Sequence, residues 1–327
     1  RDLRMSRGLG DVYKRQTMPR GKNINLFLMD GDASGRIKCT LANWTGVAYK
    51  IPRTEIEKCK TREDLKWSGV YFLFGVSDDT GENIAYIGQA GIRKNGEGIL
   101  YRLMEHKRNP DKDYWTEAVV FTTSNNSFGP TEISYLENKF CNLAIEANRY
   151  IVKNGNDPSP GHITEEKESE LEEFVDYAKL IMGTLGHKIF VPLNKSIPVT
   201  EDTSDTASEE IELFFTRTIK KLNFTVEASA KQTAEGFVVL KGSKIAPSSG
   251  ADDTISPGNR KKREECKVID NILQEDVLFT SPSSAAEFVT GKSCNGWVSW
   301  KTKDGKTLHD LEETTAAPEG TVVEPQT

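Results

Sequence analysis

The amino-acid sequence predicts a chain of the mixed α/β class, α+β in type, in which a small three-stranded antiparallel sheet is flanked by helices. Three observations support this prediction. β-rich runs lie on either side of turn signals in residues 24–50 and 69–88. Apolar residues at helical spacing follow in residues 99–108 and 130–147. A second set of β-rich and helical segments fills residues 210–312.

Composition limits the class of protein further. The chain has 327 residues, of which 36% are hydrophobic and 28% are charged, with a mean hydropathy of −0.53. These values indicate a soluble chain of two or three domains. No apolar run approaches the roughly 18 residues that a membrane span needs, and the run Ile24–Met29 is too short for a secretory signal. The sequence therefore predicts a cytoplasmic protein without a membrane partner.

Charge and cysteine usage exclude further classes. The net charge of −6 is not that of a protein that covers nucleic acid with its whole surface. The basic segments RTIKK and NRKKR still allow a local nucleic-acid footprint. The five cysteines form no C-x-x-C pair, which argues against a zinc ribbon and a disulfide framework. We expect no small-molecule organic cofactor.

The N-terminal segments are expected to stand apart from the rest of the fold. The first sixteen residues, RDLRMSRGLGDVYKRQ, resemble a translated sequencing adapter, so Met18 is the expected start. Three strands are predicted over Ile24–Met29, RIKCT and NWTGVAYKIP, as a small appended β unit. Thr54 is expected to cap a short helix over EIEKCK.

The segment from Gly69 to Gly88 has the strongest pattern in the chain. Gly69-Val70-Tyr71 and Tyr86-Ile87-Gly88 each combine a tyrosine with a glycine, and SDDTG between them is a turn signal. This pattern predicts a β-hairpin. By itself it is typical of an ordinary strand pair, because aromatic residues favour strands.

Charged residues follow the hairpin on two predicted helices. Arg102 and His106 are four residues apart, so they share one helical face, and Arg102 has Glu105 as an alternative salt-bridge partner. Glu137 lies at the edge of the apolar stripe of the long second helix. A carboxylate at such an edge is costly unless a cation or a metal pairs with it.

In this order the residues resemble the GIY-YIG nuclease family, with GVY in place of the first motif. The resemblance implies a metal-dependent endonuclease of prokaryotic type that hydrolyses phosphodiester bonds in DNA. Glu137 would bind Mg²⁺ (or Mn²⁺), Arg102 would hold a phosphate oxygen, and His106 would orient water or carry a proton. Tyr71 would be the general base, and Tyr86 would help to hold the attacking water. The alternative is a non-catalytic nucleic-acid-binding protein that keeps the fold.

Two further features extend this predicted site. The resemblance implies a site asparagine, for which Asn154 is the first choice and Asn156 the alternative, since N-G is also a turn dipeptide. The loop AGIRKNGEGI carries Arg93 and Lys94, which could contact a phosphate backbone or be ordinary loop residues.

The remaining sequence predicts an acidic helix, a linker and a second domain. The helix has an apolar stripe from Phe174 to Leu185 and is expected to stop at Gly186. Residues 196–209 have little apolar content. Strands are predicted over IELFFTR, FTVEASAK and GFVVLKGSKIA, and a helix over RKKREECKVIDNILQ. Ser281 or Ser283 is expected to cap a helix over AAEFV.

The last predicted strand, GWVSW, places Trp297 and Trp300 close to Lys292 and Lys301. Such residues could stack on nucleic-acid bases, or the tryptophans could face a core. The pattern GFVVLKGS followed by SPSSAAEFVTGKSCNGWVSWK resembles an uncharacterised C-terminal domain that often follows GIY-YIG modules in prokaryotic proteins. The predicted organisation is an adapter-derived segment (1–17), a small β unit (18–67), a nuclease domain (68–157), an acidic helix and linker (158–209), an accessory α+β domain (210–312) and a disordered tail (313–327).

Overall fold

The computed structural model describes residues 21–77, 80–94, 96–154, 163–194, 211–247 and 255–311, apart from the Asp111 side chain. The predictions made for residues 1–17, for most of the linker, for the C-terminal tail and for Asn156 fall outside these ranges. The chain divides into two units, residues 1–190 and 191–327, and each is described by itself. No described helix has the length and apolar character needed to cross a bilayer.

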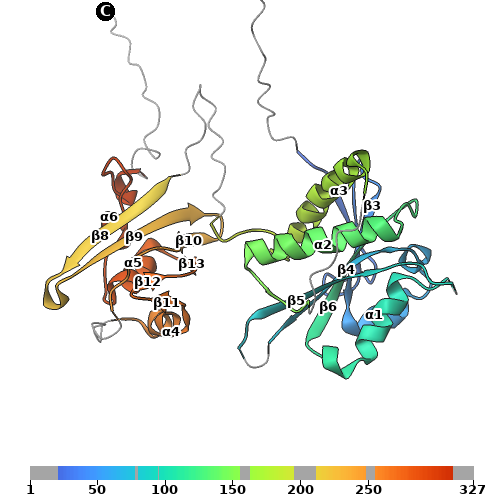
Figure 1. The fold of residues 1–327 in the computed structure, drawn as a ribbon, viewed down its shortest axis with the longest axis horizontal. Coiled ribbons are helices and arrows are strands. Elements are labelled where there is room, and N and C mark those ends of the chain that lie inside the picture. The colour runs from blue at the N-terminus through green and yellow to red at the C-terminus, as the bar shows by residue number, and fades with distance from the viewer. Residues whose placement is uncertain are drawn as a thin grey trace, which may run out of the picture. The chain divides into compact units, whose positions relative to one another are not determined.

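The first unit is built on one mixed sheet (Figure 1). Its strand order is β1-β2-β3-β6-β4-β5-β7. All neighbours run antiparallel except β5 and β7, which pair in parallel through Ile84 and Ala85. The strands are β1 (Ile24–Leu28), β2 (Ile37–Leu41), β3 (Gly46–Pro52), β4 (Gly69–Val76), β5 (Asn83–Ala90), β6 (Trp115–Thr123) and β7 (Ile151–Val152).

The α+β class is thus confirmed, but the sheet is larger than the predicted three strands. The three N-terminal strands form where they were predicted, yet they do not make a separate unit. β3 pairs with β6 from Gly46↔Thr123 to Pro52↔Glu117. The sequence did not indicate this pairing because strands that meet across a sheet can be far apart in the chain. The hairpin β4–β5 lies in the same sheet, between β6 and the short edge strand β7.

Helices cover both faces of this sheet (Figure 1). On one face, α2 and α3 bury Phe140 and Phe174 against Phe72 and Phe121 of the strands. On the other face, α1 and the 3-10 helices η1 and η2 form a second core, in which Leu103 packs against the strand side chains that point to that face. The helices are η1 (Arg53–Cys59), η2 (Glu63–Lys66), α1 (Ile99–Arg108), η3 (Pro110–Lys112), α2 (Pro130–Ala147) and α3 (Glu165–Thr184).

The acidic helix α3 belongs to the first unit, which corrects the predicted boundary at residue 157. Its apolar stripe packs into the same core as α2, and Phe174 contacts both Trp44 and Phe128. Burying this stripe is what places the acidic side chains on the opposite face. The predicted stop is confirmed, since Gly186 follows the helix with a φ of +97°.

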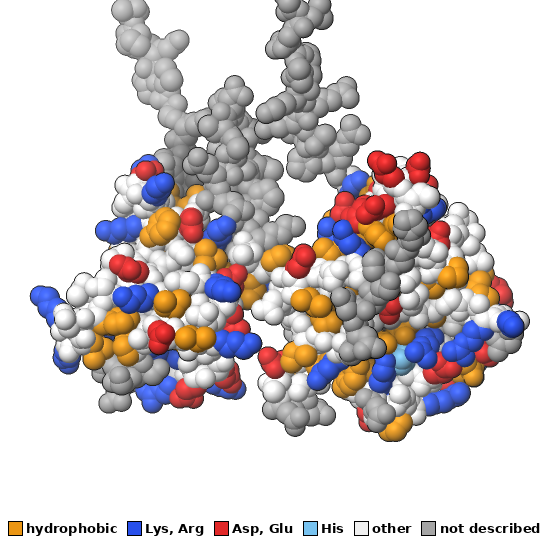
Figure 2. All heavy atoms as spheres, viewed as in Figure 1, with side chains coloured by type: hydrophobic (Ala, Val, Ile, Leu, Met, Phe, Trp, Pro, Cys, Tyr) orange, Lys and Arg blue, Asp and Glu red, His pale blue; other side chains and the backbone are white. Residues whose placement is uncertain are grey.

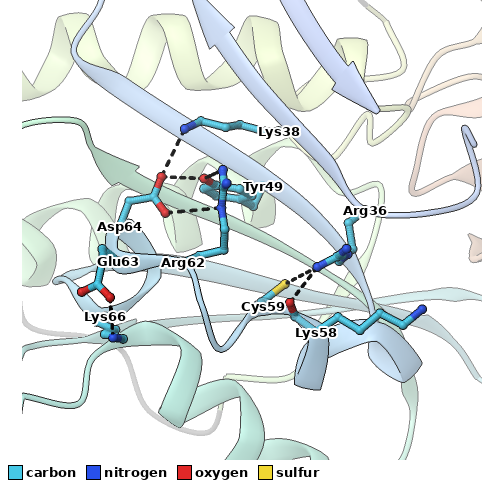
Figure 3. A network of polar contacts seen from close by, with 9 residues as sticks. All are labelled: Arg36, Lys38, Tyr49, Lys58, Cys59, Arg62, Glu63, Asp64 and Lys66. Carbon is cyan, nitrogen blue, oxygen red and sulfur yellow. Dashed lines mark hydrogen bonds and ion pairs between the residues drawn. The ribbon is translucent and has the colours of Figure 1, made fainter. Parts of the chain in front are cut away.

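A polar network joins the N-terminal strands to η2 (Figure 3). The Tyr49 hydroxyl donates to Asp64 Oδ2 at 2.5 Å and accepts from Arg62 at 2.7 Å. Lys38 also contacts Asp64, at 3.2 Å. Burial raises the pKa of Tyr49, so the hydroxyl stays protonated and serves as a structural link. Thr54 is not the expected cap, because the 3-10 helix η1 starts directly after Pro52.

The second unit has a four-stranded sheet of order β13-β10-β9-β8 and a small β11–β12 hairpin. Ser281 caps α5 by accepting from Ser284 N at 3.1 Å, which selects it over Ser283. Its elements are β8 (Glu212–Ile219), η4 (Lys220–Leu222), β9 (Phe224–Thr233), β10 (Gly236–Val239), α4 (Pro257–Glu265), β11 (Val268–Ile269), β12 (Ile272–Leu273), β13 (Val277–Phe279), α5 (Pro282–Thr290) and α6 (Gly296–Ser299).

Two predicted elements of this unit are wrong. The helix predicted over RKKREECKVIDNILQ ends at Glu265, where Cys266 is extended, and Asp270 and Asn271 adopt positive φ values in the turn between β11 and β12. The strand predicted over GWVSW is the short helix α6, capped by Asn295, whose side chain accepts from Trp297 N at 3.0 Å. An asparagine cap can override a short alternating pattern.

Candidate active site

Tyr71 and Gly88 face each other across the β4–β5 ladder. The Tyr71 ring crosses over the glycine, so a Cβ at position 88 would lie 2.4 Å from the Tyr71 hydroxyl. Real Cβ atoms essentially never come this close to another heavy atom. Only glycine at position 88 leaves room for the Tyr71 hydroxyl. This steric requirement explains why the hairpin pairs a glycine with a tyrosine.

The Tyr71 hydroxyl lies 2.7 Å from His106 Nε2, and both side chains are buried. Burial, together with the charges of Lys112 and Arg102, lowers the pKa of His106 to about 3. The imidazole is therefore neutral at pH 7. With its proton on Nδ1, it accepts the Tyr71 hydroxyl proton through Nε2. Burial also raises the pKa of Tyr71, and the nearby Arg102 guanidinium offsets this only in part.

Tyr86 completes an aromatic cluster with Tyr71 and His106. The ring centroid of Tyr86 lies 6.3 Å from that of Tyr71 and 5.5 Å from that of His106. The ammonium of Lys112 lies 3.3 Å above the centroid of the Tyr86 ring. Tyr86 is only half-buried, so this cluster reaches the surface at Tyr86. Burial and the Glu137 carboxylate raise the pKa of Tyr86.

Arg102 lies beside this cluster and also binds Glu105. Its Nη1 donates to Glu105 Oε2 at 2.8 Å, so the predicted alternative salt bridge exists. Arg93 holds the same carboxylate through two bonds of 2.8 and 3.0 Å, and the two arginines lower the pKa of Glu105 to about 2. The Arg102 side chain remains 40% exposed, and its charge opposes the rise in the pKa of Tyr71 and of Glu137 that burial causes. Arg102 is therefore fixed on one side and open to a ligand on the other.

Glu137 reaches the site from α2. Its Oε2 accepts from Gln89 Nε2 at 2.8 Å, and Gln89 directly follows Gly88 on β5. Burial raises the pKa of Glu137, while Gln89 and Arg102 oppose the shift. Its charge in turn raises the pKa of both Tyr71 and Tyr86, so the carboxylate lies within electrostatic reach of both hydroxyls. Among the described residues, no cation forms an ion pair with Glu137.

The predicted residues Tyr71, Tyr86, Arg102, His106 and Glu137 thus meet at one place on the first unit. Two members of this cluster were missed by sequence reasoning. Gln89 could have been noticed because it adjoins the glycine of the hairpin motif. Lys112 carried no signal, since it follows α1 in a turn whose position depends on the tertiary fold.

Asn154 has a structural function that the sequence did not indicate. Its side chain accepts from Ile87 N at 3.0 Å and donates to Ile87 O at 2.6 Å. It thereby pairs the N–H and the carbonyl group of Ile87 on β5, next to Gly88 and just beyond the end of β7. Asn154 thus holds β5 in place, whereas the alternative Asn156 lies outside the described residues.

Basic side chains surround the site. In Figure 2, Lys and Arg side chains gather over the part of the first unit where Figure 1 shows α1. Arg93 is exposed but engaged with Glu105, and its guanidinium also packs on the Tyr101 ring at 4.9 Å. Lys94 is exposed.

The predicted nucleic-acid residues of the second unit are placed differently. Trp300 is fully buried, donates from Nε1 to Pro282 O at 3.0 Å and packs against Phe215 and Phe237. Its predicted stacking on bases is therefore wrong, and the core alternative is correct. Trp297 is half-buried against the same core, Lys292 is half-buried and Lys301 is exposed. Trp297 and Trp300 do not form an open stacking face, because both pack against the core of the second unit.

Residues 218–312 match the family described as "Domain of unknown function (DUF4357)". The match covers less than a third of the chain and coincides with the second unit from the end of β8 onward. The predicted uncharacterised C-terminal domain is thereby confirmed. The matched segment does not include the tyrosine hairpin. Comparison with curated proteins and with solved structures gave no match.

Proposed function

We propose that the first unit is a metal-dependent endonuclease of the GIY-YIG type that hydrolyses phosphodiester bonds in DNA. The observation that carries the proposal is the buried Tyr71–His106 pair at 2.7 Å, with Arg102 and Glu137 beside it. The chain order of strand, strand, helix, strand and helix, and the sheet order β6-β4-β5, support it. The basic surface around α1 supports DNA as the substrate.

Tyr71 can take the proton of the attacking water only as its phenolate, and burial disfavours that form by raising the pKa of Tyr71. The Arg102 guanidinium opposes this rise, and a bound Mg²⁺ would favour the phenolate further. His106 is neutral, and its low pKa means that it orients Tyr71 through the hydrogen bond to Nε2 and does not keep the proton. Arg102, open on one side, would hold a phosphate oxygen as charge develops there.

Glu137 fits a magnesium ion better than a structural ion pair. Its carboxylate is bound on one side by the neutral Gln89 amide, so it keeps its charge for another partner. Mg²⁺ is commonly held by one or two carboxylates together with waters and substrate phosphates. Bound there, the ion would neutralise charge on the phosphate and stabilise the leaving oxygen. Glu137 would then position that ion beside Tyr71 and Tyr86.

The test is nicking of a supercoiled plasmid with and without Mg²⁺, by wild type and two variants. We expect Glu137→Gln and Tyr71→Phe to lower nicking at least about 100-fold, in the range of a lost acid–base group. Tyr101→Phe is the matched control, because Tyr101 lies on α1 and contacts Arg93 instead of the cluster.

Glu137→Gln should also leave DNA binding in Mg²⁺-free buffer intact and keep or slightly raise stability, since a partly buried carboxylate is removed. A variant that melts much earlier than wild type and still nicks DNA would contradict the metal-binding role. Wild-type protein that binds DNA without Mg²⁺-dependent nicking would instead support the non-catalytic binding protein.

A further inference from the structure

Lys112 lies in the candidate active site although no motif includes it. It ends η3, four residues after the last residue of α1, and its ammonium is 3.3 Å from the centroid of the Tyr86 ring. The side chain is half-buried. Its charge also reaches His106, where it is the second cause of the lowered pKa. Lys112 is therefore close to both the aromatic pair and the imidazole.

The ammonium has no acidic partner within the described part of the chain. The charged and titratable groups around it are Tyr86 from β5 and Arg102 and His106 from α1, while the adjacent Asp113 is paired with Arg53. Glu105 is held by two arginines, and Glu137 is bound to Gln89. A half-buried ammonium without an oxygen acceptor is costly. Burial and the charge of Arg102 accordingly lower the pKa of Lys112 to about 8.

We propose that Lys112 is a second phosphate-binding residue of the site, whose ammonium donates to a non-bridging oxygen of a DNA phosphodiester while Arg102 holds the same phosphate from α1. The proposal rests on the proposed function for its substrate class. Tyr86 supports one side of the ammonium through its ring face, which leaves the N–H donors of the other side for the ligand. The two cations and the two tyrosine hydroxyls would then surround one phosphate.

Three variants separate this function from simple packing on Tyr86. Lys112→Met keeps an unbranched apolar stem over the ring and removes the charge. Lys112→Arg keeps the charge at every working pH. Lys107→Met is the matched control, because Lys107 lies near Lys112 in the chain, on α1, but acts on Glu57 of η1 instead of the cluster.

Binding is measured with a fluorescent DNA duplex in EDTA, so that the readout does not depend on cleavage. We expect Lys112→Met to weaken binding about fivefold or more and to reduce the slope of log K against log salt by about 1, as for one lost phosphate contact. Lys107→Met should stay within about twofold of wild type. Equal binding by the Lys112→Met and Lys107→Met proteins would overturn the proposal.

The pH profile of kcat/KM for nicking gives a second readout. For wild type we expect a fall as pH rises through about 8, because the Lys112 ammonium loses its proton there. Lys112→Arg should keep activity and lack this fall, whereas an unchanged alkaline limb in that variant would contradict the proposal. If wild type binds DNA through Lys112 and does not nick it, the phosphate contact stands and the proposed nuclease function fails.

Discussion

Gly88 shows how a single residue sets the geometry of the candidate site. A Cβ at this position would lie 2.4 Å from the Tyr71 hydroxyl. We predict that Gly88→Ala displaces that hydroxyl from His106 and destabilises the first unit by about 1–3 kcal/mol, as overpacking does. Nicking activity should fall with it. Urea unfolding measures the loss of stability.

Gly91→Ala is the matched control for this substitution. Gly91 follows β5, and a Cβ there would have only an ordinary contact with Ile133 Cδ1 at 3.7 Å. We expect this variant to unfold within about 0.5 kcal/mol of wild type. If Gly88→Ala were equally stable and active, the steric account of the paired glycine and tyrosine would be wrong.

His106 makes the stability of the first unit depend on pH. Its pKa is 6.5 as a free side chain and about 3 in the fold, so the unfolded chain binds more protons between these values. The contribution of His106 is therefore complete above pH 6.5 and is lost as pH falls. Each pH unit below 6.5 lowers the free energy of unfolding by about 1.4 kcal/mol. We therefore predict that the first unit is about 2 kcal/mol less stable at pH 5 than at pH 7.

The measurement is urea unfolding at both pH values, followed by amide NMR signals of β4 and β5. His106→Gln should remove most of this pH dependence, while substitution of the exposed His309 in the second unit should not. A His106→Gln protein with the full wild-type difference between pH 5 and pH 7 would show that other groups cause it.

At the scale of elements, the edge of β5 depends on a side chain from another segment. β7 pairs with β5 only at Ile84 and Ala85, and Asn154 continues the pairing at Ile87 with bonds of 3.0 and 2.6 Å. We predict that Asn154→Ala destabilises the first unit by about 1–3 kcal/mol, because two backbone groups lose their partners. Hydrogen exchange at the Ile87 amide should accelerate more than exchange at central β4 amides.

Asn154→Asp is a sharper variant of the same test. Its carboxylate can still accept from Ile87 N, but its second oxygen would face Ile87 O in place of the donating amide, so we expect an effect at pH 7 at least as large as that of Asn154→Ala. Unchanged exchange at Ile87 in both variants would mean that Asn154 does not hold the edge, and would reopen its assignment as a site residue.

Elements also show where local sequence patterns were overridden. The apolar spacing of α1, α2 and α3 predicted all three helices, because a long amphipathic stripe has few other ways to be buried. The short segments around Asp270 and Trp297 were predicted wrongly. A two-residue turn at positive φ separates β11 from β12 around Asp270. At Trp297, one asparagine cap was enough to override an alternating pattern of only five residues.

At the scale of the whole molecule, the two units have separate hydrophobic cores. We predict that residues 18–194 fold alone and unfold in one cooperative transition, within a few degrees of the corresponding transition of the full chain. Residues 18–160, which match the predicted nuclease boundary more closely, should be unstable. That fragment lacks α3, and each large apolar side chain that α3 buries contributes about 1.5–3 kcal/mol.

Differential scanning calorimetry of the two fragments checks this prediction, with full-length protein as the reference. A stable 18–160 fragment with the melting temperature of 18–194 would mean that α3 is an appended helix and that the boundary predicted from sequence was right.

The sequence by itself determined most of the helices and strands and the residue types of the candidate site. The tyrosine–glycine hairpin, the spacing of Arg102 and His106, and the apolar stripes follow from local geometry, so they could be identified residue by residue. The uncharacterised C-terminal domain was likewise recognisable from its own segment. Tyr71, Tyr86, Arg102, His106 and Glu137, which the sequence suggested, come from four elements, β4, β5, α1 and α2, that the fold then brings together.

Only the tertiary structure decided the partners of these residues. That β3 pairs with β6, that Asn154 binds the backbone of β5 and that Lys112 lies over Tyr86 depend on contacts between segments distant in the chain. The protonation of the site was decided there too, because the neutral state of His106 comes from burial and from neighbouring charges. Burial and long-range pairing are properties of the packed chain, and no short segment carries them.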